Sequence, residues 1–136
     1  MIANFDAVVK KLRKEAADKL NELDAEMEKS MKAMVSKAIV KAPEATGQLK
    51  QNISFIQNGP LSYTLIADTP YAAYVEFGTG PQAGQYVPRL EQEFQDIAQD
   101  YFVNGEGKTG PKPYFYPSIQ EELPVLMENL KRIAND

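Results

Sequence analysis

The chain has 136 residues, with 15 Lys and Arg against 19 Asp and Glu, and it contains no Cys, no His and no Trp. A chain of this length forms one domain and can bury a core without disulfides or metal. The lack of Cys excludes a disulfide scaffold, a zinc ribbon and a thiol nucleophile, and the lack of His removes the commonest general base. The composition therefore favours a protein without catalysis over an enzyme.

Charge is distributed unevenly along the chain, whose formal net charge is −4. Residues 1–50 contain ten Lys/Arg and eight Asp/Glu, a net of +2, whereas residues 51–136 contain five and eleven, a net of −6. This balance argues against a general binder of nucleic acid or anionic membranes, which needs a basic surface. We expect ordinary solvated faces, because exposed ion pairs contribute little; packing between the cationic and anionic parts is the alternative.

The N-terminus and the apolar runs give no sign of export or of a membrane span. Met1–Asp6 has no basic segment followed by an apolar stretch, so we expect no signal peptide. The longest apolar run is Tyr71–Val75, far below the roughly 20 residues that a spanning helix needs. We therefore expect the protein to remain soluble in the compartment where it is made, with no membrane partner.

The first third of the chain predicts one long helix. Apolar residues from Phe5 to Ala38 recur in steps of three and four, with a mean of about 3.67, the period of a nearly straight helix. Asn4 can cap this helix and Pro43 ends it, so the pattern predicts a helix over residues 4–41. Such a helix would be roughly 55 Å long, whereas a compact domain of this size is about 37 Å across. We therefore expect another subunit to cover part of its apolar stripe.

The middle of the chain predicts strands and a short buried segment. Residues 48–67 alternate polar and apolar side chains on both sides of Asn58-Gly59-Pro60, which predicts a β-hairpin. Residues 71–77 are too short and too apolar for a solvated helix, so we expect short, buried helical turns there.

The last part of the chain predicts two more helices. The spacing of apolar residues indicates an inserted helix over 87–103, followed by a flexible Gly/Pro-rich loop over 104–113 and a short strand over 114–116. Ser118 and Glu121 match a capping box that would open a final helix over 118–134. The predicted class is a single α+β domain, in which a small, mostly antiparallel sheet is packed by the long N-terminal helix and two further helices.

Few residues could carry chemistry. Gly107-Lys108-Thr109 has the end of a phosphate-binding loop, but Phe102 stands where that motif needs Gly, and Gly110-Pro111 cannot open a helix. Glu76 differs from the other carboxylates because it lies inside the apolar run 71–77, where it could form an ion pair at a helix edge, be a buried acid or contact a partner. No pattern predicts a metal, a nucleotide or another cofactor.

Three segments, taken in order, resemble one family. Lys41–Ile53 is similar to an A-P-x-x-T-G-x-L-x-x-S-I signature, Pro70–Gly80 to a Y-A-x-Y-V-E-F-G-T signature, and Lys112–Ile119 to an R-P-F-x-x-P-A segment. Together they resemble the gene-product-ten-like family of long-tailed bacteriophages, which includes neck, head–tail joining and tail-completion proteins. The signature residues, which are also the predicted subunit contacts, are Pro43, Thr46, Gly47, Leu49, Tyr71, Ala72, Tyr74, Val75, Glu76, Phe77, Gly78, Thr79, Pro113, Phe115 and Pro117.

The resemblance implies a virion structural protein rather than an enzyme. Such a subunit assembles, commonly as a hexameric ring, at the junction of head and tail, after it has been made in the host cytoplasm. Its partners would be further copies of itself, the head-completion or portal complex and the tail tube, with DNA passing only through the lumen. This chain departs from the signatures at Asn52, Lys112 and Ser118, and it carries an insert over 81–112.

Three alternatives remain open at this point. Within the structural class, the chain could be a head-side adaptor or a minor capsid component. Outside that class, it could be a cytosolic helical adaptor that engages a partner through residues 4–41, or a carboxylate-based hydrolase that uses Glu76.

Overall fold

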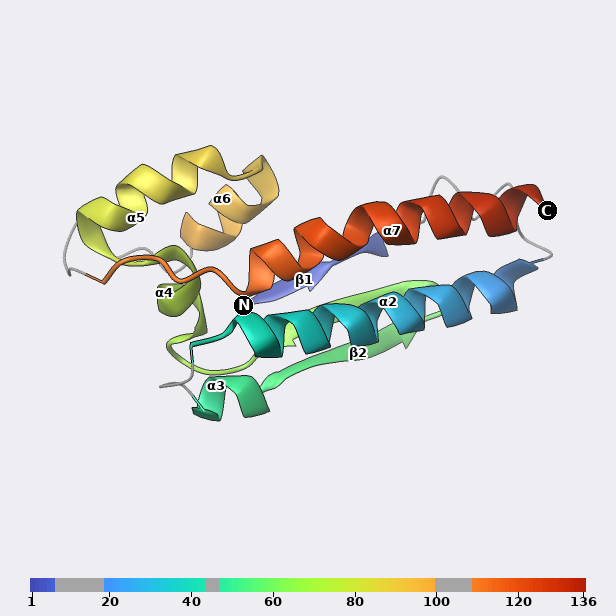
Figure 1. The fold of residues 1–136 in the computed structure, drawn as a ribbon, viewed down its shortest axis with the longest axis horizontal. Coiled ribbons are helices and arrows are strands. Elements are labelled where there is room, and N and C mark those ends of the chain that lie inside the picture. Colours follow the sequence, from blue (N-terminus) through green and yellow to red (C-terminus); the bar gives the residue numbers. More distant parts are fainter. Residues whose placement is uncertain (7–18, 44–46, 100–108) are drawn as a thin grey trace.

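The computed structural model describes residues 1–6, 19–43, 47–99 and 109–136, and it has the predicted α+β fold (Figure 1). Its sheet contains three antiparallel strands, β1 (Ile2–Asn4), β2 (Ile53–Gly59) and β3 (Ser62–Ala67), in the order β1-β3-β2. Leu65 of β3 is paired with Ala3 on one side and with Phe55 on the other. Because side chains alternate between the faces of a sheet, this register places Ala3, Phe55 and Leu65 together on one inner face.

Two long helices lie over this inner face. α2 (Leu20–Lys41) and α7 (Phe115–Asn135) run antiparallel to each other, as the colours in Figure 1 show. The apolar stripe that the helical spacing predicted is present in α2, and its inward side chains are at most 1 % exposed: Leu23, Met27, Met31, Met34 and Ala38. This stripe and the inner face of the sheet together form the core.

Polar side chains join α2 to α7 beside the apolar contact. The carboxylate of Glu122 is buried and accepts hydrogen bonds from the Ser30 hydroxyl at 3.2 Å and from Lys37 Nζ at 3.1 Å. Further along the same pair of helices, Asn129 Nδ2 donates to Glu26 Oε1 at 2.9 Å. Because hydrogen bonds are directional, these bonds constrain how far the two helices can slide past each other, in addition to the packing of their apolar side chains.

The prediction of one helix over residues 4–41 is wrong at its N-terminal end. Residues Ile2–Asn4 form β1, and α2 begins only at Leu20, while residues 7–18 lie outside the described residues. Ala3 and Phe5, two positions apart, are buried and Ile2 is exposed, a short alternation that the longer helical period concealed. With 22 residues, α2 is about 33 Å long, so the helix is no longer too long for its domain.

Two other boundaries also differ from the prediction. Residues Gly47–Gln51 form the short helix α3, so the hairpin starts at Ile53 rather than at residue 48. The predicted strand over 114–116 is wrong, because α7 begins at Phe115. The capping box at Ser118 does not form; its hydroxyl lies inside the helix and donates to Phe115 O at 2.6 Å. The first amides of α7 are bonded instead by a side chain from another element.

The segment between the sheet and α7 is divided into short helices. The predicted turns over 71–77 are helix α4 (Ala72–Phe77), followed by α5 (Gly80–Tyr86), the 3-10 helix η3 (Val87–Arg89) and α6 (Gln92–Gln99). A single helix over 87–103 is therefore wrong, because the backbone is extended at Leu90, with φ −85° and ψ 164°. Residues 100–108, which include part of the predicted loop over 104–113, lie outside the described residues.

The turn of the hairpin is held by α2. Leu61 has a φ of +59°, a value that is uncommon for a residue with a side chain, and it is 1 % exposed. The carboxylate of Asp24 in α2 accepts hydrogen bonds from Leu61 N and from Gln57 Nε2, both at 3.0 Å. The burial of Leu61 and the bonds to Asp24 offset the backbone strain, so the far end of the hairpin is anchored to the helical layer.

Candidate functional site

The second family signature forms α4 and the turn after it, and residues 109–116 lie against this segment. Lys112 N donates to Val75 O at 2.8 Å, and Thr79 N donates to Thr109 O at 2.8 Å. The Thr79 hydroxyl accepts a further hydrogen bond from Thr109 N at 2.9 Å. We call the contact between residues 72–79 and 109–116 the signature clamp, because main-chain bonds join the two segments along its length.

Glu76 is the centre of the signature clamp. Its side chain projects from α4 to the start of α7 and is fully buried. Oε1 accepts hydrogen bonds from Tyr114 N at 2.9 Å and Phe115 N at 2.6 Å, and Oε2 accepts one from Tyr116 N at 3.3 Å. The first amides of a helix have no partner within the helix, and they carry the positive end of its dipole. A carboxylate from α4 therefore caps α7, in place of a side chain from α7 itself.

Two opposing effects act on the pKa of Glu76. Burial removes the carboxylate from water and raises the pKa, whereas the three amide donors stabilise the charged form and lower it. Burial is the larger effect, and the pKa is raised to about 7. Glu76 therefore exchanges its proton near neutral pH, while it remains enclosed by the fold.

Tyr114 adds a side-chain bond to the clamp. The residue is fully buried, and its hydroxyl donates to Ala72 O at 2.9 Å. Burial, together with the nearby charge of Glu76, raises the pKa of Tyr114 above its usual range, so the hydroxyl stays protonated and keeps its role as a donor. The bond ties the residue before α7 to the first turn of α4.

Gly78 is the position at which the clamp requires a glycine. Its φ is +77°, and a Cβ at this site would lie 2.8 Å from Pro111 N and 2.8 Å from Thr109 O. Both of those atoms belong to the backbone and cannot rotate away. The glycine of the signature therefore serves the close approach of residues 109–111 as well as the exit from α4.

The structure brings together some of the signature residues and separates others. Ala72, Val75, Glu76, Gly78 and Thr79 contribute side chains or backbone atoms to the clamp, and Phe115 enters it through its amide, whereas Tyr74 is half-buried and its carbonyl oxygen accepts a hydrogen bond from Gly78 N. Leu49 lies apart in α3, where it is fully buried in the core, and Gly47 begins that helix and is exposed. Phe77 is buried in the core, while Pro43, Tyr71, Pro113 and Pro117 are half-buried. Thr46 lies outside the described residues.

The pairing of Glu76 with α7 was not predicted from the sequence. A charged residue inside the apolar run 71–77 marked Glu76 as unusual, but its partners are backbone amides, which leave no pattern of side chains. The signature around Pro113 was the one available signal, because it lies just before those amides. Neither residues 71–77 nor the signature around Pro113 contains a pattern that predicts capping of one segment by the other.

The arrangement is built to hold the chain rather than to react with a substrate. The oxygens of Glu76 are occupied by amides inside the protein, which leaves them without the open access that a general acid or nucleophile needs. Within the described ranges, the structure contains no group of three or more acidic side chains that could hold a metal ion. Among the helices of those same ranges, none is both long and apolar enough to cross a membrane.

Comparison with known proteins identifies the family. Residues 1–78 match the model of the HK97-gp10-like family, described as "Bacteriophage HK97-gp10, putative tail-component". The match covers more than half of the chain, so the protein belongs to this family of phage tail components, as the resemblance predicted. It ends at Gly78, and the clamp thus joins the matched segment to the part of the chain beyond it. No curated protein and no solved structure matches the chain.

The pKa of Glu76 makes stability depend on pH. An unfolded carboxyl titrates near 4.5 and the folded one near 7, so between these values the folded protein binds more protons and stability falls as pH rises. We expect the unfolding free energy of wild type, relative to that of Glu76→Gln, to decrease by about 3 kcal/mol from pH 4.5 to 7.5. Urea titrations of both proteins across this range measure the difference. A difference that stays constant or grows with pH would contradict the dominant effect of burial.

The steric role of Gly78 can be tested with a matched glycine. Gly78→Ala should lower the unfolding free energy by roughly 2–4 kcal/mol, because the new Cβ meets fixed backbone atoms at a positive φ. Gly84 lies in α5 with open space around its Cβ position, so Gly84→Ala should be neutral or stabilise by up to about 1 kcal/mol. Equal effects of the two substitutions in chemical denaturation would contradict this role of Gly78.

Proposed function

We propose that this tail component is a ring-forming subunit of the neck, which completes the tail and joins it to the head. The observation that carries the proposal is the use that the fold makes of the family signature. The chain belongs to a phage tail-component family, and its most distinctive signature is Pro70–Gly80. Glu76 of this signature bonds α4 to the start of α7 and does not line a reactive cleft. This use supports a part that acts through its shape and its contacts, without catalysis or cofactor.

The proposed assembly is a homo-oligomeric ring, with a hexamer as the expected size. It would bind the head-completion or portal complex on one side and the tail tube on the other, in the virion, after assembly in the host cytoplasm. The half-buried signature residues Tyr71, Tyr74, Val75 and Thr79 are the members of the signature segment around α4 that remain partly accessible for subunit contacts. The net charge of −6 over residues 51–136 supports an anionic lumen that DNA passes without binding.

The alternatives are supported less well. A hydrolase that uses Glu76 would need that carboxylate in contact with solvent, whereas it is enclosed and bonded to three amides. An adaptor whose residues 4–41 order only on binding a partner does not agree with α2, whose inward side chains are already part of the core. A head-side adaptor or a minor capsid component remains the alternative within the structural class, and its position in the particle separates it from the proposal.

The proposal predicts defined assembly by the intact protein. Native mass spectrometry and electron microscopy of the purified protein, alone and with purified tails, should show a closed ring that attaches to one end of the tail. Immunolabelling of mature particles should place the protein at the head–tail junction; labelling on the capsid would favour the head-side alternative. A strict monomer in both conditions that is also absent from mature particles would contradict the proposal, and a Lys/Arg-lined bore in the ring would contradict the anionic lumen.

A further inference from the structure

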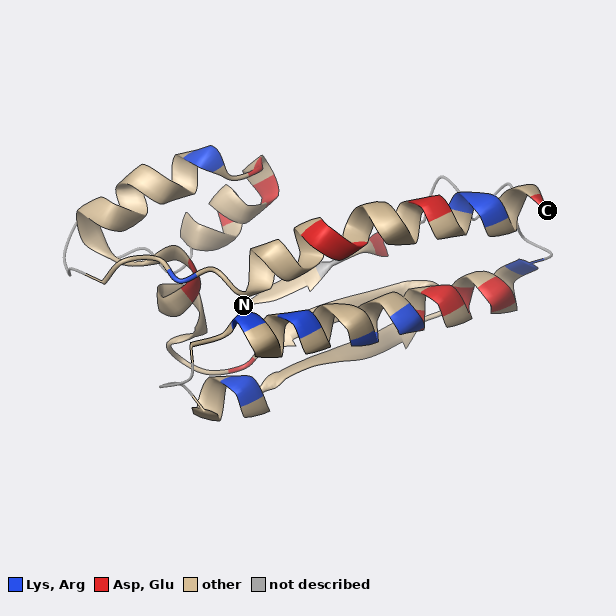
Figure 2. Cartoon of the chain, viewed as in Figure 1, with Lys and Arg blue, Asp and Glu red and all other residues tan. Residues whose placement is uncertain are grey.

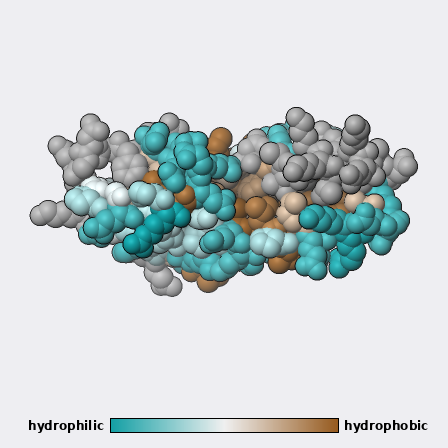
Figure 3. All heavy atoms as spheres, turned by 90° about the horizontal axis from the view of Figure 1, so that it is seen from above, coloured by the Kyte–Doolittle hydropathy of each residue, from teal (hydrophilic) through white to brown (hydrophobic). Residues whose placement is uncertain are grey.

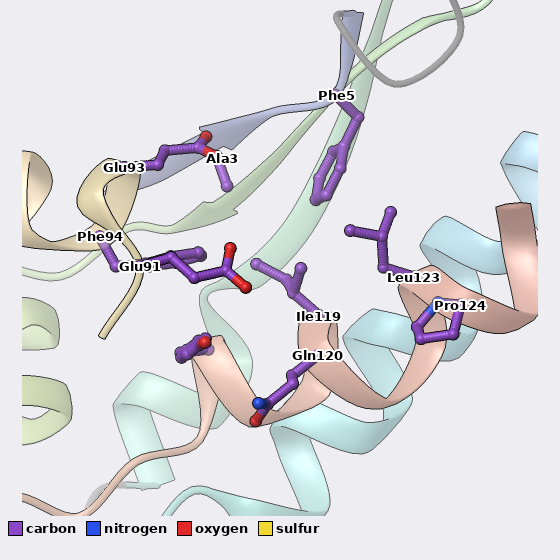
Figure 4. A pocket seen from close by; sticks show the side chains of 10 residues that line it. Ala3, Phe5, Glu91, Glu93, Phe94, Ile119, Gln120, Leu123 and Pro124 are labelled. Carbon is purple, nitrogen blue, oxygen red and sulfur yellow. The ribbon is translucent and has the colours of Figure 1, made fainter. Parts of the chain in front are cut away.

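An apolar pocket opens between β1, α6 and α7, away from the signature clamp. Its volume is about 370 Å³, and its lining includes the apolar side chains of Phe5, Phe94, Ile119 and Leu123 together with Gln120. Figure 4 shows these side chains converging from the three elements. In the view from above, hydrophobic atoms are exposed midway along the molecule, with hydrophilic side chains on both sides (Figure 3). Phe5, Phe94 and Ile119 are each 4 % exposed, so the apolar wall lies inside the pocket rather than on the open surface.

Two carboxylates, those of Glu91 and Glu93, belong to the lining of this pocket. Glu91 and Glu93 line it and are exposed, and neither forms an ion pair with any residue of the described ranges. In Figure 4 the Glu91 carboxylate extends toward Ile119. Partial burial, and next the charge of Glu91, raise the pKa of Glu93. Two effects make these charges unfavourable: the carboxylates repel each other, and the apolar surface beside them reduces their contact with water. A positively charged group from a partner would offset both effects.

A surface of opposite character lies on α2. Lys29, Lys32, Ser36 and Val40 succeed one another at spacings of three and four residues, so they share the solvent face of the helix, where Lys32 also pairs with Glu28 at 3.6 Å. Val40 is 80 % exposed, which makes it the most exposed large apolar side chain of the described residues. Between residues 29 and 50 the chain has five Lys and one Glu, a net of +4, although Lys37 and Lys41 pair with Glu122 and Glu121 of α7. Between 68 and 99 it has one Arg and five acidic residues, a net of −4. Figure 2 shows the blue positions on α2 and α3 and red positions on α6.

We propose that Val40 and the lysines of its helix face on one copy dock into the pocket of the next copy, where Glu91 and Glu93 face those lysines. The two surfaces complement each other in charge and in apolar character, and they lie on different elements of the same molecule. A contact between different surfaces is head-to-tail, and such contacts generate a ring when the rotation between neighbours closes. The inference rests on the proposed function, because it names the contact that builds the ring.

Engineered cysteines test this contact directly, because the chain has none of its own. Val40→Cys and Gln120→Cys place one thiol on each proposed surface, and both positions are exposed. Under mild oxidation we expect a disulfide-linked dimer when the two variants are mixed, and at least tenfold less linked dimer from either variant alone. Val40→Cys mixed with Ile56→Cys is the control, because Ile56 is exposed on the outer face of the sheet. Linking with Ile56→Cys that equals linking with Gln120→Cys would overturn the proposal.

Charge and apolar variants test whether the contact builds the assembly. Val40→Asp and the double variant Glu91→Lys/Glu93→Lys should each abolish the ring in native mass spectrometry, and an equimolar mixture should give a 1:1 dimer, since each variant keeps one intact surface. Glu128→Lys is the control, because Glu128 is exposed on α7 and does not line the pocket. Rings that persist in both variants would overturn this contact and leave the proposed function in place. A wild-type protein that stays monomeric, alone and with tails, would overturn both.

Discussion

The structure depends on one buried carboxylate that satisfies the first amides of a helix distant in sequence. Glu76 leaves α4 and accepts hydrogen bonds from Tyr114, Phe115 and Tyr116 at the start of α7. The first backbone N–H groups of a helix cost free energy when they are buried without a hydrogen-bond acceptor. The side chains near the start of α7 are aromatic and apolar, and the acceptor comes from Glu76 instead. α7 in turn covers α2 and the inner face of the sheet. The position of the second long helix is thus set by a residue from a separate, earlier element of the chain.

This arrangement explains why the family signature spans α4 and its exit. Glu76 supplies the cap, Gly78 allows residues 109–111 to approach, and Thr79 pairs with Thr109 on both its amide and its hydroxyl. The family match ends at Gly78, so these residues bond the matched part of the chain to the part beyond it. Between the two halves of the clamp lie α5, η3 and α6, and this segment carries acidic side chains and one wall of the apolar pocket.

The parts of the fold that depend on periodicity could be predicted from the sequence. The stripe from Leu23 to Ala38 and the alternation on both sides of Asn58-Gly59 each repeat often enough to outweigh chance. Features that depend on a few residues or on distant backbone were missed. β1 has three residues, which are too few for an alternation of apolar and polar side chains to be recognised. The helical spacing of residues 5–38 instead led to a predicted helix that began at residue 4. The predicted start of α7 was three residues late, because Ser118 suggested a local capping box whereas the cap comes from Glu76.

The central claim is that the Glu76 carboxylate holds the start of α7, and amide hydrogen exchange of the native protein tests it most directly. In wild type, the amides of Tyr114 and Phe115 should be strongly protected, because both donate to Glu76 Oε1 in the buried core. In Glu76→Ala, protection of these amides should fall at least tenfold more than that of amides in the middle of α2, which do not contact Glu76. Equal protection of Tyr114 and Phe115 in both proteins would contradict the account.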